Sequence, residues 1–101
     1  MTTVTCTKKD GFHFECVNHS GDHDTCTICS TLCNVLVCAI QLIGVMPEVY
    51  ESGHVIINVT DEQIKNVRTG MTLTFLSVMD AFRELEKQSG NLTVNAELWG
   101  V

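Results

Sequence analysis

A histidine, an aspartate and a cysteine lie close together near the start of the chain: His19, Asp24 and Cys26. Asp24 and Thr25 are good helix N-cap residues, so a helix is expected to begin at about residue 25. Cys26 would then lie in the first helical turn, where unpaired N–H groups and the helix dipole favour a thiolate. His19 lies seven residues upstream and is able to take the thiol proton. The pattern predicts a Cys-His pair that carries out nucleophilic catalysis.

Each of these two roles has a competing residue. Cys29 is the alternative nucleophile, although its more interior helical position favours packing. His23 is the alternative base, because it is closer to Cys26 in sequence than His19 is. We favour Cys26 as nucleophile and His19 as base, since His19 is expected at the end of a strand, just before the cysteine loop.

The neighbouring polar residues have two interpretations each. Asp24 either orients His19, as in a catalytic triad, or caps the helix. Ser30 lies one helical turn beyond Cys26, where its hydroxyl either steadies the thiolate or bonds back to the preceding turn. The amides of Cys26 and the residue after it are the expected oxyanion donors, and Gly21 is the expected hinge of the loop.

These residues resemble the active-site segment of the bacterial ribosomal-processing cysteine proteases, the Prp family. That family carries Gly-His-Ala, a short loop, and then Asp-x-x-Cys-x-x-x-Ser at the start of a helix. His19, Asp24, Cys26 and Ser30 stand at the matching positions. The loop here is shorter, and one residue instead of two separates Asp24 from Cys26.

The resemblance covers residues 18–30 in motif and most of the chain in the order of its elements. Asn18 replaces the glycine of the motif, and Ser20 replaces its alanine. The resemblance implies a compact mixed α/β fold, a homodimer, and a cysteine endopeptidase that needs no cofactor. It also implies the substrate: the N-terminal extension of a large-subunit ribosomal protein, cut after a pair of aromatic residues.

Histidines and cysteines recur every three or four residues, which also raises a second hypothesis: a non-catalytic binding module with a zinc or redox site. The set comprises His13, Cys16, His19, His23, Cys26, Cys29 and Cys33. Cys26 and Cys29 have the spacing of a redox pair. However, His13 and Cys16 are expected on opposite faces of a strand, and the last two cysteines in an apolar helix. We therefore expect no metal.

Composition limits the function. One hundred and one residues, 45% of them apolar, make one domain with a modest core, which a dimer would enlarge. A net charge of −6 argues against nucleic-acid binding, which needs a basic face, and suits a basic partner. The chain is thus expected to bind a peptide or protein.

The six cysteines are expected to be reduced. The first residues have a strand pattern and not that of a signal peptide. Four cysteines fall in one predicted helix, where few pairs could bridge: Cys26, Cys29, Cys33 and Cys38. The apolar run at residues 35–45 is too short to span a membrane. These features predict a cytoplasmic protein that does not bind membranes.

Hydrophobic periodicity predicts the elements that position the reactive residues. Strands are expected at residues 3–8, 12–17, 54–59 and 92–98, helices at 25–43 and 71–89, a helical turn at 61–67, and a connector at 48–53. A turn at Lys9, Asp10 and Gly11 joins the first two strands into a hairpin. The order β-β-α-β-α-β predicts an α+β two-layer sandwich with helices packed on a mixed sheet.

Both helices show which face they bury. The first is apolar nearly all round after Asn34, so the sheet with the second helix, or a partner subunit, is expected to cover it. The buried stripe of the second helix is predicted to comprise Leu73, Leu76, Val78, Met79, Phe82 and Leu85. Trp99 is expected to cover the core or a dimer seam.

Overall fold

The two alternating segments at the start of the chain form an antiparallel hairpin, as predicted. In the computed structural model, which describes residues 1–97, β1 (Thr2–Lys8) pairs with β2 (Gly11–Val17). The turn requires a glycine at Gly11, whose φ is 126° and where an added Cβ would lie 1.9 Å from the Val59 carbonyl oxygen. This glycine lets the hairpin turn lie directly against the neighbouring strand.

The hairpin is the centre of a mixed five-stranded sheet with the order β3-β4-β2-β1-β5. β4 (His54–Thr60) lies antiparallel to β2, and β3 (Val49–Glu51) forms one edge. β5 (Leu92–Glu97) runs parallel to β1 and forms the other edge. The sheet confirms the α+β prediction.

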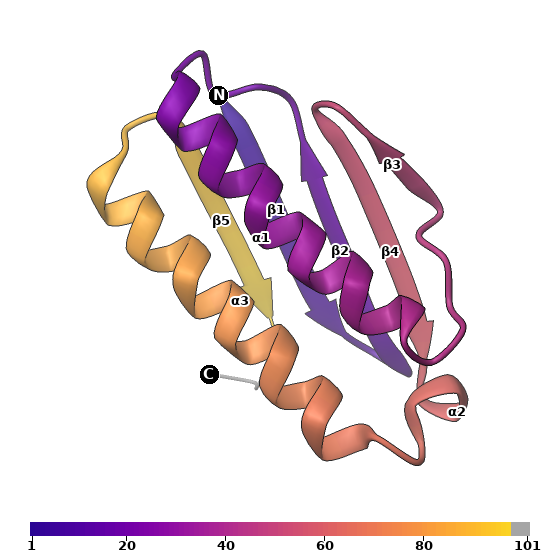
Figure 1. Cartoon of the computed structure of the whole chain (residues 1–101). Helices are drawn as coiled ribbons and strands as arrows, with labels where there is room; N and C mark the ends of the chain where they lie inside the picture. The colour runs from indigo at the N-terminus through magenta and orange to yellow at the C-terminus, as the bar shows by residue number, and fades with distance from the viewer. Residues whose placement is uncertain (98–101) are drawn as a thin grey trace.

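Two long helices cover one face of this sheet. α1 (His23–Gln41) and α3 (Arg68–Gln88) lie side by side across it, and the short α2 (Asp61–Ile64) precedes α3 (Figure 1). The core lies between the two layers. Aromatic rings join them: Phe12 stacks on Phe75 with ring centroids 4.5 Å apart, and Phe14 meets Phe82 at 5.9 Å.

The connector predicted at residues 48–53 is partly a strand, which corrects the expected number of strands. Tyr50 pairs with Val55, and Ser52 and Gly53 make the turn between β3 and β4. Three residues are too few to show a clear alternation in the sequence. Glu51 is the last residue of this edge strand.

The long helices also differ from the prediction in where they begin. α3 begins at Arg68 and not at residue 71, because Gly70 is tolerated within its first turn. Its buried face includes Met71 and Phe75, whereas Leu73 is 57% exposed and was wrongly assigned to the stripe. The earlier start does not alter the helical period, and the apolar positions from Val78 onward are buried as predicted.

α1 begins at His23, two residues before the expected start. Its N-cap is Asp22, which accepts hydrogen bonds from the Asp24 amide (3.3 Å) and the Thr25 hydroxyl (2.6 Å). The helix ends at Gln41 and is followed by a turn that Gly44 closes with a φ of 80°. Asp24 is therefore not the cap, since its own amide donates to the side chain of Asp22.

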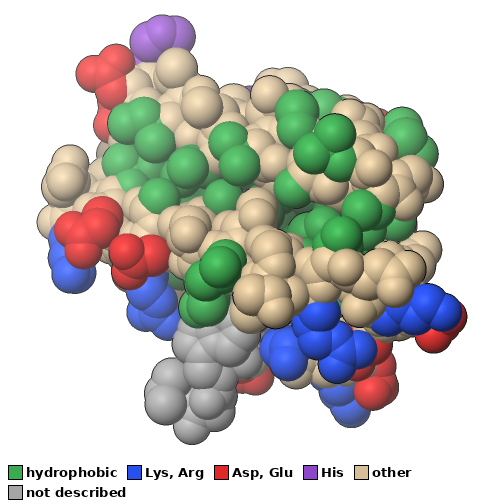
Figure 2. Space-filling view, turned by 60° about the horizontal axis from the view of Figure 1, so that its bottom comes forward, with side chains coloured by type: hydrophobic (Ala, Val, Ile, Leu, Met, Phe, Trp, Pro, Cys, Tyr) green, Lys and Arg blue, Asp and Glu red, His purple; other side chains and the backbone are tan. Residues whose placement is uncertain are grey.

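The outer surface of the helical layer is apolar in several places. Figure 2 shows hydrophobic side chains in patches on the face it presents. Along α1, Ile28, Val35 and Leu42 are 43%, 44% and 88% exposed. Among residues 1–97, α1 is the one helix that is long and apolar enough to cross a membrane. α1 nevertheless packs on the sheet and on α3 as part of a compact globular fold.

The last residues of the chain, 98–101, lie outside the described part. The prediction for Trp99 therefore stays a prediction, as does the last residue of the fourth predicted strand.

The N-cap assignment predicts unequal effects of two neighbouring aspartates. Asp22→Ala should lower the free energy of unfolding by about 1–2 kcal/mol, the usual cost of losing a cap. Asp24→Ala should lower it by less than about 0.5 kcal/mol, because its side chain is exposed. Urea denaturation followed by circular dichroism measures both. Equal losses, or a larger loss for Asp24→Ala, would contradict the assignment.

Candidate active site

Cys26 lies in the first turn of α1, as predicted, and its thiol contacts the loop that precedes the helix. The Ser20 hydroxyl is 3.1 Å from the Cys26 Sγ atom, and the Ser20 amide donates to it at 3.4 Å. Ser20 is itself buried, and its hydroxyl also lies 2.9 Å from the Asp22 carbonyl oxygen. The hydroxyl proton can therefore turn from Asp22 to the sulfur when the thiol ionises.

These contacts favour the thiolate. The Ser20 hydroxyl, then the Ser20 amide, and then a hydrogen bond with His19 lower the pKa of Cys26 to about 7 from an ordinary 9.0. The Gly21 amide acts in the same direction. Near neutral pH a large fraction of Cys26 is thus ionised, which is the nucleophilic form of a cysteine.

His19 lies on the turn of the β3–β4 hairpin. A Cβ added to Gly53 would lie 2.6 Å from its Nε2 atom and 3.0 Å from two ring carbons, so the ring lies directly on this glycine. The backbone is held there too, because the Asn18 amide donates to the Gly53 carbonyl oxygen at 2.8 Å. The buried Thr2 hydroxyl donates to the Asn18 carbonyl oxygen at 3.1 Å. Sequence reasoning did not predict this contact between loop and hairpin.

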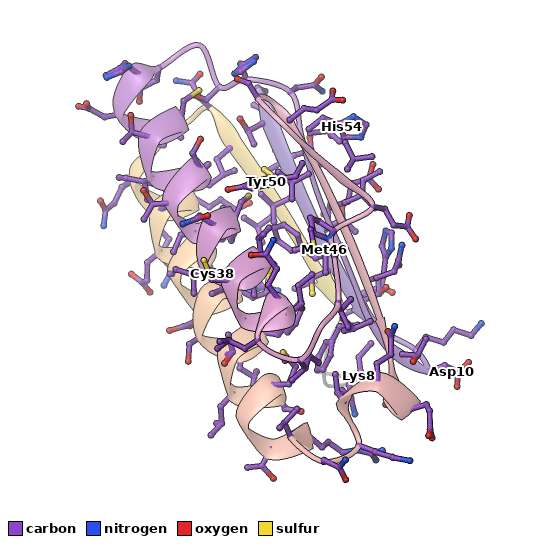
Figure 3. The ribbon with its side chains drawn as sticks, turned by 45° about the vertical axis from the view of Figure 1, so that its right-hand side comes forward. Lys8, Asp10, Cys38, Met46, Tyr50 and His54 are labelled. Carbon is purple, nitrogen blue, oxygen red and sulfur yellow. The ribbon has the colours of Figure 1, made fainter. Side chains whose placement is uncertain are left out.

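His19 and Cys26 line one open cavity of about 310 Å³, between the first half of α1 and the β3–β4 hairpin. Its lining also includes Ser30, Cys29, Cys33 and Cys16 on the helix and sheet side, and Tyr50 to Val55 on the hairpin side. Tyr50 donates from its hydroxyl to the Asn34 Oδ1 atom of α1 at 2.8 Å. Figure 3 shows Tyr50 between the hairpin and α1, whereas Cys38 lies on the outer side of the helix.

The other cavity cysteines, Cys16, Cys29 and Cys33, are buried. Burial raises the pKa of Cys29 to about 12. A hydrogen bond with Cys33 lowers the pKa of Cys16, and the same bond together with burial raises that of Cys33. Cys29 thus has the packing role expected for it, and the described chain contains no disulfide among its six free cysteines.

The remaining predicted residues fall in different places. Ser30 lines the cavity and is exposed, and among residues 1–97 its hydroxyl makes no hydrogen bond with the Cys26 thiol. His23 is the first residue of α1, is exposed, and does not line the cavity. Within residues 1–97 the Asp24 carboxylate has no hydrogen bond, so nothing there couples it to His19. Gly21 has a φ of 82° and open surroundings.

The Cys26 amide, one of the two expected oxyanion donors, is not free. The Cys26 amide donates to the Asp22 carbonyl oxygen at 2.9 Å, because the helix begins early enough to use it. The loop amides of Ser20 and Gly21 instead donate hydrogen bonds to the sulfur. Successive amides at a positive-φ residue form an anion-binding concavity. Ser20 is thus a site residue that the motif comparison treated only as a replacement for alanine; its signal was the Ser-x-Asp turn before the helix.

The zinc hypothesis finds no support in this geometry. In the described part of the chain, no group of three or more His, Cys, Asp or Glu side chains is placed to hold a metal ion. His13 instead hydrogen-bonds Asn58 at 2.5 Å, away from the cavity.

Comparison with known proteins supports the fold and not a function. No protein-family model matches the sequence, and no curated protein matches it either. Among solved structures, the chain is similar to SMU.848 from Streptococcus mutans, with a TM-score of 0.70 and 19% identity. The match covers 97% of this chain and 95% of that one. The two chains share a fold over nearly their whole length.

The thiolate contacts predict a reactive cysteine. In a Cys38→Ser background, which removes the most exposed other thiol, iodoacetamide should alkylate Cys26 with a rate that rises to half its maximum near pH 7. The sign follows from the lowered pKa, since the thiolate is lost as the pH falls through that value. Mass spectrometry of the alkylated peptide measures the rate.

Ser20→Ala is the matched control, because it removes the hydroxyl and keeps the amide. It should move the midpoint upward and slow alkylation at pH 7 by roughly threefold or more, in proportion to the lost thiolate. An unchanged midpoint would show that the hydroxyl does not stabilise the sulfur.

Proposed function

We propose that the protein is a cysteine endopeptidase in which Cys26 is the nucleophile and His19 the general base and acid. One observation carries the proposal: a half-buried thiol, hydrogen-bonded by Ser20, shares an open cavity with an imidazole. The cavity is large enough for a side chain of a bound peptide. The resemblance to ribosomal-processing cysteine proteases selects peptide hydrolysis among the reactions of activated thiols.

In the first half of the reaction, His19 accepts the thiol proton and the Cys26 thiolate attacks the scissile carbonyl carbon. The new S–C bond makes a tetrahedral oxyanion, which the loop amides of Ser20 and Gly21 stabilise. The imidazolium then gives its proton to the leaving nitrogen, and the C–N bond breaks. The products are a free amine and a thioester on Cys26.

In the second half, His19 removes a proton from a water molecule that attacks the thioester carbonyl. The C–S bond breaks, the carboxylic acid leaves, and the sulfur returns as the thiolate. His19 retains the water proton, so the pair returns to its starting charge. Ser30 stands at the cavity wall, where it contacts the bound peptide.

The proposed substrate is an N-terminal extension of a large-subunit ribosomal protein, in the cytoplasm of a bacterial cell. The net charge of −6 supports a basic partner of this kind. Gly21, with its open surroundings, is the proposed hinge that lets the loop admit the peptide. The loop at residues 18–22 is short, so the β3–β4 hairpin and α1 make most of the contacts with the peptide.

We also propose a homodimer through α1. The helix carries no charged residue after Asp24, and Ile28, Val35 and Leu42 recur every seven residues on its outer side. Such spacing gives one apolar stripe along a helix. For an acidic chain, an uncharged stripe is the surface on which two copies meet without repulsion.

A thiol redox module is the second candidate, because Cys16, Cys26, Cys29 and Cys33 all line the cavity. It predicts a disulfide among these four after mild oxidation, and no peptide cleavage. Mass spectrometry of the unreduced protein detects it.

The peptidase proposal predicts cleavage of peptides that carry the extended N-terminus of a ribosomal protein with paired aromatic residues. Cys26→Ala should abolish the cut, and His19→Ala should slow it by about 10²–10⁴-fold, the usual contribution of a general base. Mass spectrometry identifies the cut and its rate.

Two matched variants test the assignment. Cys29→Ala and His23→Ala should cleave at close to the wild-type rate, since one residue packs in the core and the other lies outside the cavity. Loss of cleavage in Cys29→Ala but not in Cys26→Ala would overturn the choice of nucleophile.

The dimer predicts a change of mass in solution. Light scattering should give about twice 11.2 kDa for the wild type and one chain mass for Val35→Glu. Asn95→Glu is the control, because it adds the same charge at an exposed position on the opposite face of the sheet. A wild-type monomer, or a dimer that survives Val35→Glu, would refute this interface.

A further inference from the structure

We infer that Gly53, at the turn of the β3–β4 hairpin, is a positioning residue that seats the His19 imidazole beside Cys26. This inference rests on the proposed function, since it explains how the proposed base is held. It adds a residue from the far side of the cavity, thirty-four positions from His19 in the sequence.

The first step is the contact itself. The three atoms nearest to a Cβ built on Gly53 all belong to the His19 ring, at 2.6, 3.0 and 3.0 Å. Real Cβ atoms do not approach other heavy atoms at 2.6 Å, so any other residue at position 53 must displace the ring. The contact lies on the ring edge that carries Nε2, one of the two nitrogens able to exchange a proton.

The second step is that the turn carrying Gly53 also binds the backbone next to His19. Gly53 has a φ of 78° in the turn between two paired strands, and its carbonyl oxygen accepts from the Asn18 amide. Asn18 has a φ of 71°, which turns the chain from β2 towards the hairpin. The Asn18 backbone and one side of the exposed His19 ring therefore both contact the same turn.

The third step concerns what else orients the ring. In many Cys-His and Ser-His sites a carboxylate or amide side chain holds the second nitrogen. Within residues 1–97 no carboxylate hydrogen-bonds or ion-pairs with His19, and Asp24 is not coupled to it. Packing on Gly53 thus takes the place of an orienting side chain.

The test compares two glycines with the same backbone conformation. Gly53→Ala and Gly44→Ala both place a side chain at a positive φ, 78° and 80°, but the surroundings of Gly44 are open. Strain is therefore similar, and only Gly53→Ala pushes on His19. We expect Gly53→Ala to lower kcat for peptide cleavage by about tenfold or more with little change in KM, since a displaced base loses most of its effect. Gly44→Ala should keep the wild-type kcat.

Two further measurements do not depend on activity. The His19 ring signals in an NMR titration should shift in Gly53→Ala and not in Gly44→Ala. A double-mutant cycle measures the effect of Gly53→Ala on stability in two backgrounds. The substitution should destabilise the wild type more than it destabilises the His19→Ala variant, because that variant lacks the clashing ring. Additive stability losses with unchanged His19 signals would overturn the inference.

These readouts separate the two claims. If the wild type cleaves no peptide, the proposed function fails, and the NMR titration still decides whether Gly53 seats the ring. If the wild type cleaves and Gly53→Ala and Gly44→Ala lose kcat equally, the function stands and the role of Gly53 is refuted.

Discussion

The Asp22 side chain accepts from the Asp24 amide and the Thr25 hydroxyl, and so determines the residue at which α1 begins. The geometry around the sulfur follows from this point. Because the helix begins at His23, the Cys26 amide is already used by the helix, and the sulfur projects towards the loop and not towards free helix amides. The thiolate is stabilised by the loop that precedes the helix, chiefly by Ser20.

The two reactive groups of the cavity are carried by different structural elements. The sulfur belongs to a long helix packed on the sheet, whereas the imidazole rests on a hairpin at the edge of that sheet. The two walls are joined across the opening by the Tyr50 hydroxyl and Asn34. The relative position of sulfur and ring therefore depends on how β3 and β4 pack under α1, and not on the loop alone.

The sequence was informative wherever a repeated pattern was long enough. Alternation identified β1, β2, β4 and β5, and the helical turn predicted at residues 61–67 contains α2, which begins with a capping box of Thr60 and Gln63. Short or non-repetitive features were missed: the three residues of β3, the start of α3 before Gly70, and the cap at Asp22. A cap depends on which of several adjacent polar residues has the right backbone conformation, and composition does not decide that.

For the site, the sequence placed Cys26 and His19 near each other because only six residues separate them. It did not reveal Ser20 as a partner of the sulfur, since a serine in a loop has many possible hydrogen bonds. The contact with Gly53 was beyond reach, because it joins positions far apart in the chain through a turn that had not been recognised as a hairpin. Local chemistry was predictable, and long-range contact was not.

The parallel pairing of β5 with β1 has a consequence for biosynthesis. Thr2 donates from its amide to the Asn91 carbonyl oxygen, and the Thr25 hydroxyl, which donates to Asp22, lies 3.1 Å from the Ser89 hydroxyl. The segments beside the sulfur thus obtain these partners from residues that are synthesised 64 or more positions later. A nascent chain that lacks β5 has β1 paired with β2 alone, and the start of α1 lacks its contact with Ser89, so the thiol obtains its complete surroundings only after β5 has been synthesised.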